Sequence, residues 1–137
     1  MEYKTVTDLA AIAEVRVQKP PMSRAERLRR WAECLERQPA RQLNSLHEIE
    51  WAPGSERRRM RADNSPLSVA FEDAVLREEG LASDRLGDAM DFFQLTEAEA
   101  HRILCYCHHG RSMQADYAAK SVRHMANGPV NRRFGFW

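Results

Sequence analysis

The spacing of apolar residues predicts helices along most of the chain. The clearest pattern begins where Ser23 and Glu26 form a capping box and ends at Pro39. Apolar residues recur between these points at intervals of three and four, the period of one helix face: Leu28, Trp31, Ala32 and Leu35. The charged residues at the other positions are expected to face solvent: Arg24, Arg27, Arg30 and Glu33.

A second helix is predicted between Ser65 and Gly80. Ser65 is a suitable N-cap residue, and Pro66 suits the first turn because its missing N–H leaves no helix bond unmade. The stripe expected to face the core is Leu67, Ala70, Phe71 and Ala74. Gly80 followed by the apolar Leu81 predicts a Schellman ending.

Three more helices are predicted in the C-terminal half. Ser83 is expected to cap a short helix with helical apolar spacing at Leu86, Ala89, Met90 and Phe93. A capping box of Thr96 and Glu99 opens the next helix, which covers residues 96–110. The last helix is predicted to start at Ser112, with apolar residues at Ala115, Ala118, Val122 and Met125, and to stop at Asn127, Gly128 and Pro129.

Three other segments have weaker patterns. Residues 5–17 are predicted to form an N-terminal helix through Leu9, Ile12 and Ala13, which Pro20 and Pro21 separate from the rest. Residues 41–51 are predicted to form a short helix with Leu43, Leu46, Ile49 and Trp51. Residues 53–64 are charged and irregular, and they contain the run Arg57, Arg58, Arg59 and Arg61.

Alternating patterns of strand type are almost absent, so the predicted fold is all-α, a compact bundle of five to seven short helices. A length of 137 residues suits one domain, taken as 1–137. Residues 1–21 are expected to be a loosely attached N-terminal helix and linker. Residues 129–137 are expected to be an aromatic C-terminal tail.

Composition narrows the classes of function. There are 21 basic and 20 acidic residues, giving a formal net charge of +1, so nonspecific binding to nucleic acid or to an anionic membrane has no global electrostatic support. The sequence has neither a secretory signal pattern nor 18 consecutive apolar residues. With 3 cysteines, the protein is expected to be cytoplasmic with free thiols.

Five of the chain's histidines and cysteines fall within residues 101–109, on the helix opened by Thr96. On a helical projection Ala100, Ile103, Leu104 and Cys107 face the core, whereas His101, Cys105 and His108 share a neighbouring arc. Imidazole and thiolate side chains four and three residues apart can bind a transition metal such as zinc. Candidates for a fourth ligand are His124, His47, Cys34 and Asp116.

The same residues also suit an ordinary helix. His101 and His108 are then boundary residues, His109 lies near a helix C-terminus where the dipole favours a cation, and no cofactor is bound. A Cys105 nucleophile activated by His101 or His108 would be the catalytic alternative. No glycine-rich oxyanion or phosphate loop accompanies it in the sequence, so the chain is not expected to be an enzyme.

The stretch from Leu86 to Leu104 has the outline of a helix-turn-helix. DNA reading requires donors at the start of the second helix, whereas this chain has Glu97 and Glu99 there. Nucleic acid is therefore not the expected partner.

The C-terminal tail carries an unusual number of large aromatic side chains, because Phe134, Phe136 and Trp137 follow directly on the basic Arg132 and Arg133. Aromatic residues flanked by arginine are typical of interface cores. The tail either covers a groove of its own domain or binds a partner or a second copy. The sequence as a whole therefore favours a small helical binding or adaptor protein acting through protein contacts, with metal binding as the alternative and helix-turn-helix nucleic-acid binding as a weaker one.

Overall fold

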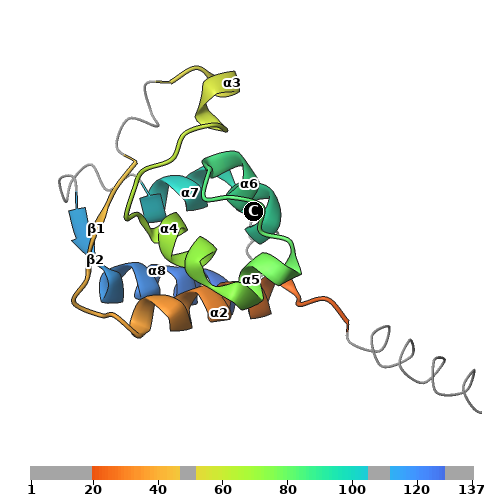
Figure 1. Cartoon of the computed structure of the whole chain (residues 1–137), viewed down its shortest axis with the longest axis vertical. Coiled ribbons are helices and arrows are strands. Elements are labelled where there is room, and N and C mark those ends of the chain that lie inside the picture. The colour runs from red at the N-terminus through yellow and green to blue at the C-terminus, as the bar shows by residue number, and fades with distance from the viewer. Residues whose placement is uncertain (1–19, 47–51, 105–111, 129–137) are drawn as a thin grey trace, which may run out of the picture.

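The computed structural model describes residues 20–46, 52–104 and 112–128, which form a mostly helical compact domain (Figure 1). In these residues there are seven helices and one two-stranded sheet. In chain order they are α2 (Arg24–Glu36), β1 (Gln42–Asn44), α3 (Gly54–Arg57), α4 (Pro66–Glu72), α5 (Ala74–Glu79), α6 (Leu86–Phe93), α7 (Glu97–Leu104), β2 (Ser112–Gln114) and α8 (Ala115–Asn127). The predicted helical bundle is confirmed, with the small sheet as an addition.

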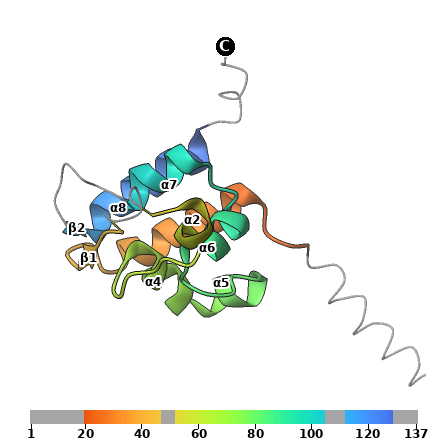
Figure 2. The same cartoon turned by 90° about the horizontal axis from the view of Figure 1, so that it is seen from above.

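Helices α2 and α8 pack side by side and form one side of the domain, while α4 to α7 cover their inner face (Figures 1 and 2). The predicted capping box of α2 is present, because Ser23 Oγ accepts from the Glu26 N–H and Glu26 accepts from the Ser23 N–H. The predicted apolar stripes of both helices are buried: Leu28, Trp31, Ala32, Leu35, Ala115, Ala118, Val122 and Met125.

Two predicted boundaries are wrong, because strand β1 follows α2 and strand β2 precedes α8. Residues 42–44 form a strand where a helix over 41–51 was predicted, and β2 occupies the residues from Ser112 that were assigned to the last helix. The strands are antiparallel, with Leu43 opposite Met113 and Asn44 opposite Ser112. Leu43 and Met113 are buried between exposed neighbours, so three residues of alternation suffice when a partner strand satisfies the backbone.

The helix predicted between Ser65 and Gly80 is interrupted at Asp73. This residue has extended backbone angles (φ −85°, ψ 122°), and its carboxylate caps α5 by accepting from the Leu76 N–H at 3.1 Å. The interruption rotates the following residues, so Ala74, predicted to face the core, is exposed. The Schellman ending is confirmed: Gly80 has φ +124°, and the Leu81 N–H donates to Leu76 O at 3.1 Å.

The segment predicted to be irregular contains the short helix α3 and then supports the start of α6. The backbone carbonyls of Met60 and Arg58 accept from the N–H groups of Leu86 and Gly87, each at 2.8 Å. They take the place of a side-chain cap. The prediction that Ser83 caps this helix is wrong, because the N-cap is Arg85. Ser83 Oγ accepts from the Arg85 N–H and donates to Asp88 at 2.6 Å.

The core is centred on two stacked aromatic rings. Trp31 and Phe93 are both 0% exposed, and their ring centroids lie 4.5 Å apart. The indole N–H of Trp31 donates to Pro66 O at 2.9 Å, so the one polar atom of this buried side chain has a hydrogen-bond partner. Trp51, the last apolar residue of the helix predicted over 41–51, lies outside the described residues.

Two arginines of α2, Arg24 and Arg27, contact the end of α6 and the turn to α7, contrary to the prediction that they face solvent. Arg24 Nε donates to Phe93 O at 3.1 Å, and its Nη2 contacts both carboxylate oxygens of Glu99 at 3.0 Å. Arg27 Nη1 donates to Phe92 O at 2.8 Å, and its guanidinium carbon lies 4.1 Å from the centre of the Phe92 ring. These half-buried cations satisfy carbonyls at the end of α6, where a helix favours positive charge.

None of the helices in the described segments is both long and apolar enough to cross a membrane.

Candidate functional site

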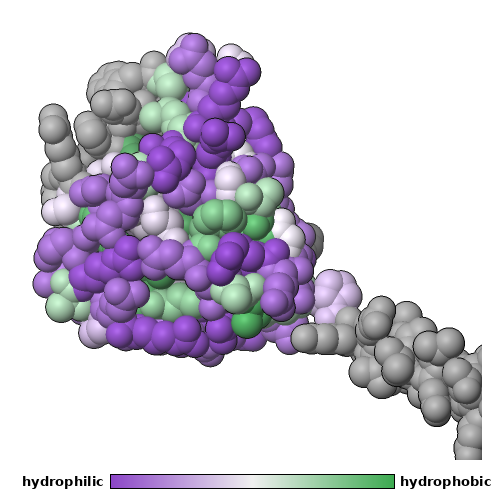
Figure 3. Space-filling model, viewed as in Figure 1, coloured by the Kyte–Doolittle hydropathy of each residue, from purple (hydrophilic) through white to green (hydrophobic). Residues whose placement is uncertain are grey.

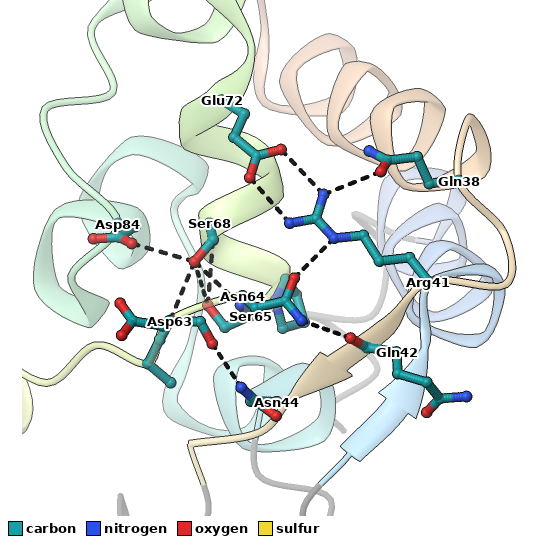
Figure 4. Close-up of polar contacts among 12 residues, drawn as sticks. Gln38, Arg41, Gln42, Asn44, Asp63, Asn64, Ser65, Ser68, Glu72 and Asp84 are labelled. Carbon is teal, nitrogen blue, oxygen red and sulfur yellow. Dashed lines mark hydrogen bonds and ion pairs between the residues drawn. The ribbon is translucent and has the colours of Figure 1, made fainter.

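A network of polar side chains joins β1, the loop before α4 and α4 itself (Figure 4). Arg41 contacts both carboxylate oxygens of Glu72, at 3.1 and 3.0 Å, and Asn64 Oδ1 at 2.8 Å. Asn64 has a left-handed backbone (φ 56°) and donates to Gln42 O at 2.7 Å. Asparagine tolerates this conformation better than most residues. These contacts fix the path of the loop against the strand.

The serines at the start of α4 extend this network inward. Ser65 Oγ accepts from the Ser68 N–H at 3.2 Å, and Ser68 Oγ donates to Ala62 O at 3.1 Å and lies 3.3 Å from Asp84. The paired Arg61 guanidinium lowers the pKa of Asp84, against the opposing effect of burial. Ser65 is 0% exposed, so its role is helix capping. These hydrogen bonds hold the loop against β1 and α4, so we interpret the network as structural.

The residues predicted to bind metal are only partly described. His101 is half-buried on α7, and His124 is exposed in the last turn of α8. Cys105 and His108 lie outside the described residues. Among the residues of 20–46, 52–104 and 112–128, no three histidine, cysteine or acidic side chains are grouped so that they could hold a metal ion.

Backbone contacts show which part of the fold leads into the His/Cys segment. The Leu46 N–H donates to Leu104 O at 2.7 Å, and Asn44 pairs with Ser112 in the sheet. The next residues in the sequence after Leu46 and Leu104 are His47 and Cys105. His124 is instead nine residues beyond Ala115 on α8, roughly 14 Å along the helix axis.

Two further ligand candidates, Cys34 and Asp116, lie on α2 and at the start of α8. Cys34 is 5% exposed on α2, and burial raises the pKa of its thiol to about 11, with the nearby Asp73 carboxylate adding to the effect. A thiol with this pKa is protonated near neutral pH and is a poor metal ligand or nucleophile. Asp116 is half-buried at the start of α8, where its N–H donates to Pro39 O.

The start of the predicted second helix of a helix-turn-helix is occupied by ion pairs. Helices α6 and α7 are present with a turn between them, and Gln94 in that turn has a left-handed backbone (φ 53°). Glu97 pairs with Arg57 at 3.2 Å, and Glu99 pairs with Arg24 at 3.0 Å. Acidic residues therefore lie where a DNA-reading helix would need donors.

The predicted partner-binding tail, Arg132 to Trp137, lies outside the described residues. A surface that the sequence did not indicate is found on α5. Val75 is 38% exposed there, one of two large apolar side chains that are exposed among the described residues, the other being Tyr117. In Figure 3 apolar side chains appear at this face over α4 and α5, surrounded by hydrophilic ones.

Acidic groups lie beside Val75 on the same side of α5. Glu78 and Glu79 follow it by three and four residues, so the three side chains are neighbours on the helix. Glu79 is half-buried, and its Oε1 accepts from the Met22 N–H at 2.9 Å. We call Val75, Glu78 and Glu79 the α5 surface. The helical pattern had assigned Phe71 and Ala74 to an inner stripe; the signal that was missed is Asp73, a capping residue in the middle of the pattern.

Comparison with protein-family models, with curated proteins and with solved structures finds no match for this chain.

Proposed function

We propose that the protein is a small binding or adaptor protein that acts through contacts with another protein, and that the α5 surface is one of its contact sites. The observation that carries this proposal is the exposed Val75 beside two carboxylates. An apolar side chain with acidic neighbours fits a partner segment that combines apolar and basic residues.

The internal use of charge supports this proposal over nucleic-acid binding. Two groups of arginines are dense in basic charge in the sequence, at positions 24, 27, 29 and 30 and at positions 57, 58, 59 and 61, and six of these eight contact acidic groups or carbonyls of the same domain: Arg24, Arg27, Arg30, Arg57, Arg58 and Arg61. Binding to phosphates requires cations that are available to release counterions. Those arginines would have to give up intramolecular partners first.

The aromatic tail is proposed as a second contact, through Arg132, Arg133, Phe134, Phe136 and Trp137. Its side chains have the apolar and basic character that suits the α5 surface, so a second copy of the chain is one partner that the proposal includes. Deletion of residues 130–137 tests this contribution: an unchanged oligomeric state, stability and partner set would exclude the tail.

The α5 surface is tested by placing the photoreactive residue p-benzoylphenylalanine at position 75 of the full chain, in the cells that make the protein. Lys120, exposed on α8, is the matched control position. We expect a product of one defined mass from position 75, weakened by Glu78→Lys and absent from position 120. The same products from both positions, or none from position 75, would contradict the proposal.

Metal binding is the second candidate function, and the Leu46–Leu104 contact favours a particular version of it. This hydrogen bond joins the residues that precede His47 and Cys105. We propose that, if His101, Cys105 and His108 bind zinc, His47 is a better fourth ligand than His124. Native mass spectrometry of the reduced protein with added zinc tests this. Stoichiometric zinc that His101→Ala and His47→Ala lose, and His124→Ala retains, supports it; a metal-free protein refutes it.

A further inference from the structure

The α5 surface lies next to the point where the N-terminal segment enters the domain. The Met22 N–H donates to Glu79 Oε1 at 2.9 Å, and Met22 is half-buried. Val75 precedes Glu79 by one helical turn, about 6 Å along the axis. The residues before Met22 therefore begin at the acidic end of α5, about one helical turn from its exposed apolar side chain.

The pattern of the N-terminal segment complements this surface. Residues 5–17, which lie outside the described residues, are predicted to form a helix with Leu9, Ile12 and Ala13 on one face. Arg16 continues that face three residues after Ala13. An apolar stripe followed by a cation therefore corresponds to the order of Val75 followed by Glu78 and Glu79 on α5.

The spacings agree when the two segments run in the same direction. Ile12 precedes Arg16 by four residues, as Val75 precedes Glu79. Five residues separate Arg16 from Met22, and an extended chain of this length spans up to about 18 Å, which is enough to place Arg16 at the acidic end of α5.

We propose that residues 5–17 dock on the α5 surface of the same chain, with Ile12 against Val75 and Arg16 beside Glu78 and Glu79. This proposal rests on the proposed function in one respect: the docked segment occupies the surface that a protein partner would use, and so it competes with that partner. The site is then regulated by its own N-terminal segment.

The docking is tested on the purified full chain, without any partner. The same photoreactive residue at position 75 is irradiated, and the products are mapped by mass spectrometry. We expect an intrachain link to residues 5–17, with position 120 on α8 as the control. The variant Leu9→Asp with Ile12→Asp is expected to lower the yield at least about fivefold, because a charge cannot replace an apolar contact without loss.

A charge exchange distinguishes docking from random collisions of a tethered segment. Arg16→Glu is expected to reduce the intrachain product, and adding Glu78→Arg is expected to restore it. Equal yields from positions 75 and 120, a product that is insensitive to these substitutions, or a product with twice the chain mass would overturn the proposal.

The two hypotheses about the α5 surface fail separately. An intrachain product without any partner product contradicts the proposed function and leaves the docking intact. A partner product whose yield is unchanged when residues 1–19 are deleted contradicts the competition, whereas a rise in its yield of several-fold supports it.

Discussion

Asp73 lies at the break between α4 and α5 and contacts a residue of α2 as well. Its carboxylate contacts Arg30 through two hydrogen bonds, Nε to Oδ2 at 2.9 Å and Nη2 to Oδ1 at 2.8 Å. The same carboxylate caps α5 by accepting from the Leu76 N–H. The bonds to Arg30 lower the pKa of Asp73, although burial opposes the shift. The charged form is therefore favoured by the fold.

We predict that Asp73→Ala lowers the free energy of unfolding by about 2–4 kcal/mol, through loss of a cap and of a charged partner for Arg30. Asp73→Asn keeps a capping oxygen and should cost less. Because the folded pKa of Asp73 is lowered, its contribution is present above the unfolded pKa of about 3.9 and is lost as pH falls through the folded pKa.

Urea unfolding at pH 7 and pH 3 measures this dependence. The wild-type protein should lose more stability on acidification than Asp73→Asn. Glu33→Gln is the control, since Glu33 is 51% exposed and lies 4.0 Å from Arg30. Identical losses for the wild type and Asp73→Asn would show that the ion pair does not contribute.

Cys34 is expected to affect the stability of the protein at alkaline pH. Burial raises the pKa of its thiol to about 11, so the unfolded chain loses the proton first as pH rises. The raised folded pKa means that the contribution is complete below the unfolded value of about 8.5 and is lost between that value and about 11. The wild type should therefore lose about 1–3 kcal/mol more than Cys34→Ala between pH 8 and pH 11, measured by urea unfolding; parallel losses would contradict a buried thiol.

Helix α6 depends on the close approach of a loop at its first turn. A Cβ on Gly87 would lie 2.7 Å from the Cβ of Arg58, and the Gly87 N–H donates to Arg58 O at 2.8 Å. Any side chain at this position must push the loop away and weaken the bonds that satisfy the start of the helix. The glycine is thus required by contact between segments, since its own φ is not left-handed.

Replacement of Gly87 by alanine should lower the free energy of unfolding by about 1–3 kcal/mol, measured by urea unfolding. Gly54→Ala is the matched control, because a Cβ at Gly54 meets nothing within 4 Å. Its effect should stay within about 1 kcal/mol in either direction. Equal effects of the two substitutions would mean that the loop at Arg58 can move away from position 87 without lowering the free energy of unfolding.

Elements that begin or end with a local signal could be predicted, and those that depend on distant partners could not. The capping boxes at Ser23 and Thr96 and the glycine ending at Gly80 involve residues within one turn, so the sequence contains the whole interaction. The break at Asp73 combines a local cap on the Leu76 N–H, which the helical pattern concealed, with a contact to Arg30, 43 residues away. The strands pair Leu43 with Met113, and each is only 3 residues long.

The difference between local and distant contacts also explains which parts of the candidate sites could be predicted from the sequence. The His/Cys arc was visible in the sequence because its spacing is local, whereas the contact between Leu46 and Leu104 that favours His47 joins distant segments. Val75 could not be singled out while Asp73 was taken to lie inside a continuous helix. Its exposure follows from where α5 begins, and that boundary lies at Asp73, which caps α5 and also contacts Arg30.

At the scale of the whole molecule, α2 contacts α4, α5, α6 and α8, and its central residue Trp31 stacks on Phe93 from α6. A core shared in this way is expected to unfold as one unit, because no helix can leave without exposing apolar surface of the others. Far-UV circular dichroism and tryptophan fluorescence should therefore give coincident urea transitions.

The substitution Trp31→Phe tests whether the stack of Trp31 on Phe93 makes the helices around it unfold in one transition. It removes the donor to Pro66 O and leaves a gap beside Phe93, so the free energy of unfolding should fall by about 1–3 kcal/mol with the denaturant slope unchanged. Val75→Ala, at an exposed position, should change it by less than about 0.5 kcal/mol. Two separate transitions in the variant would show that the helices around Trp31 form more than one cooperative unit.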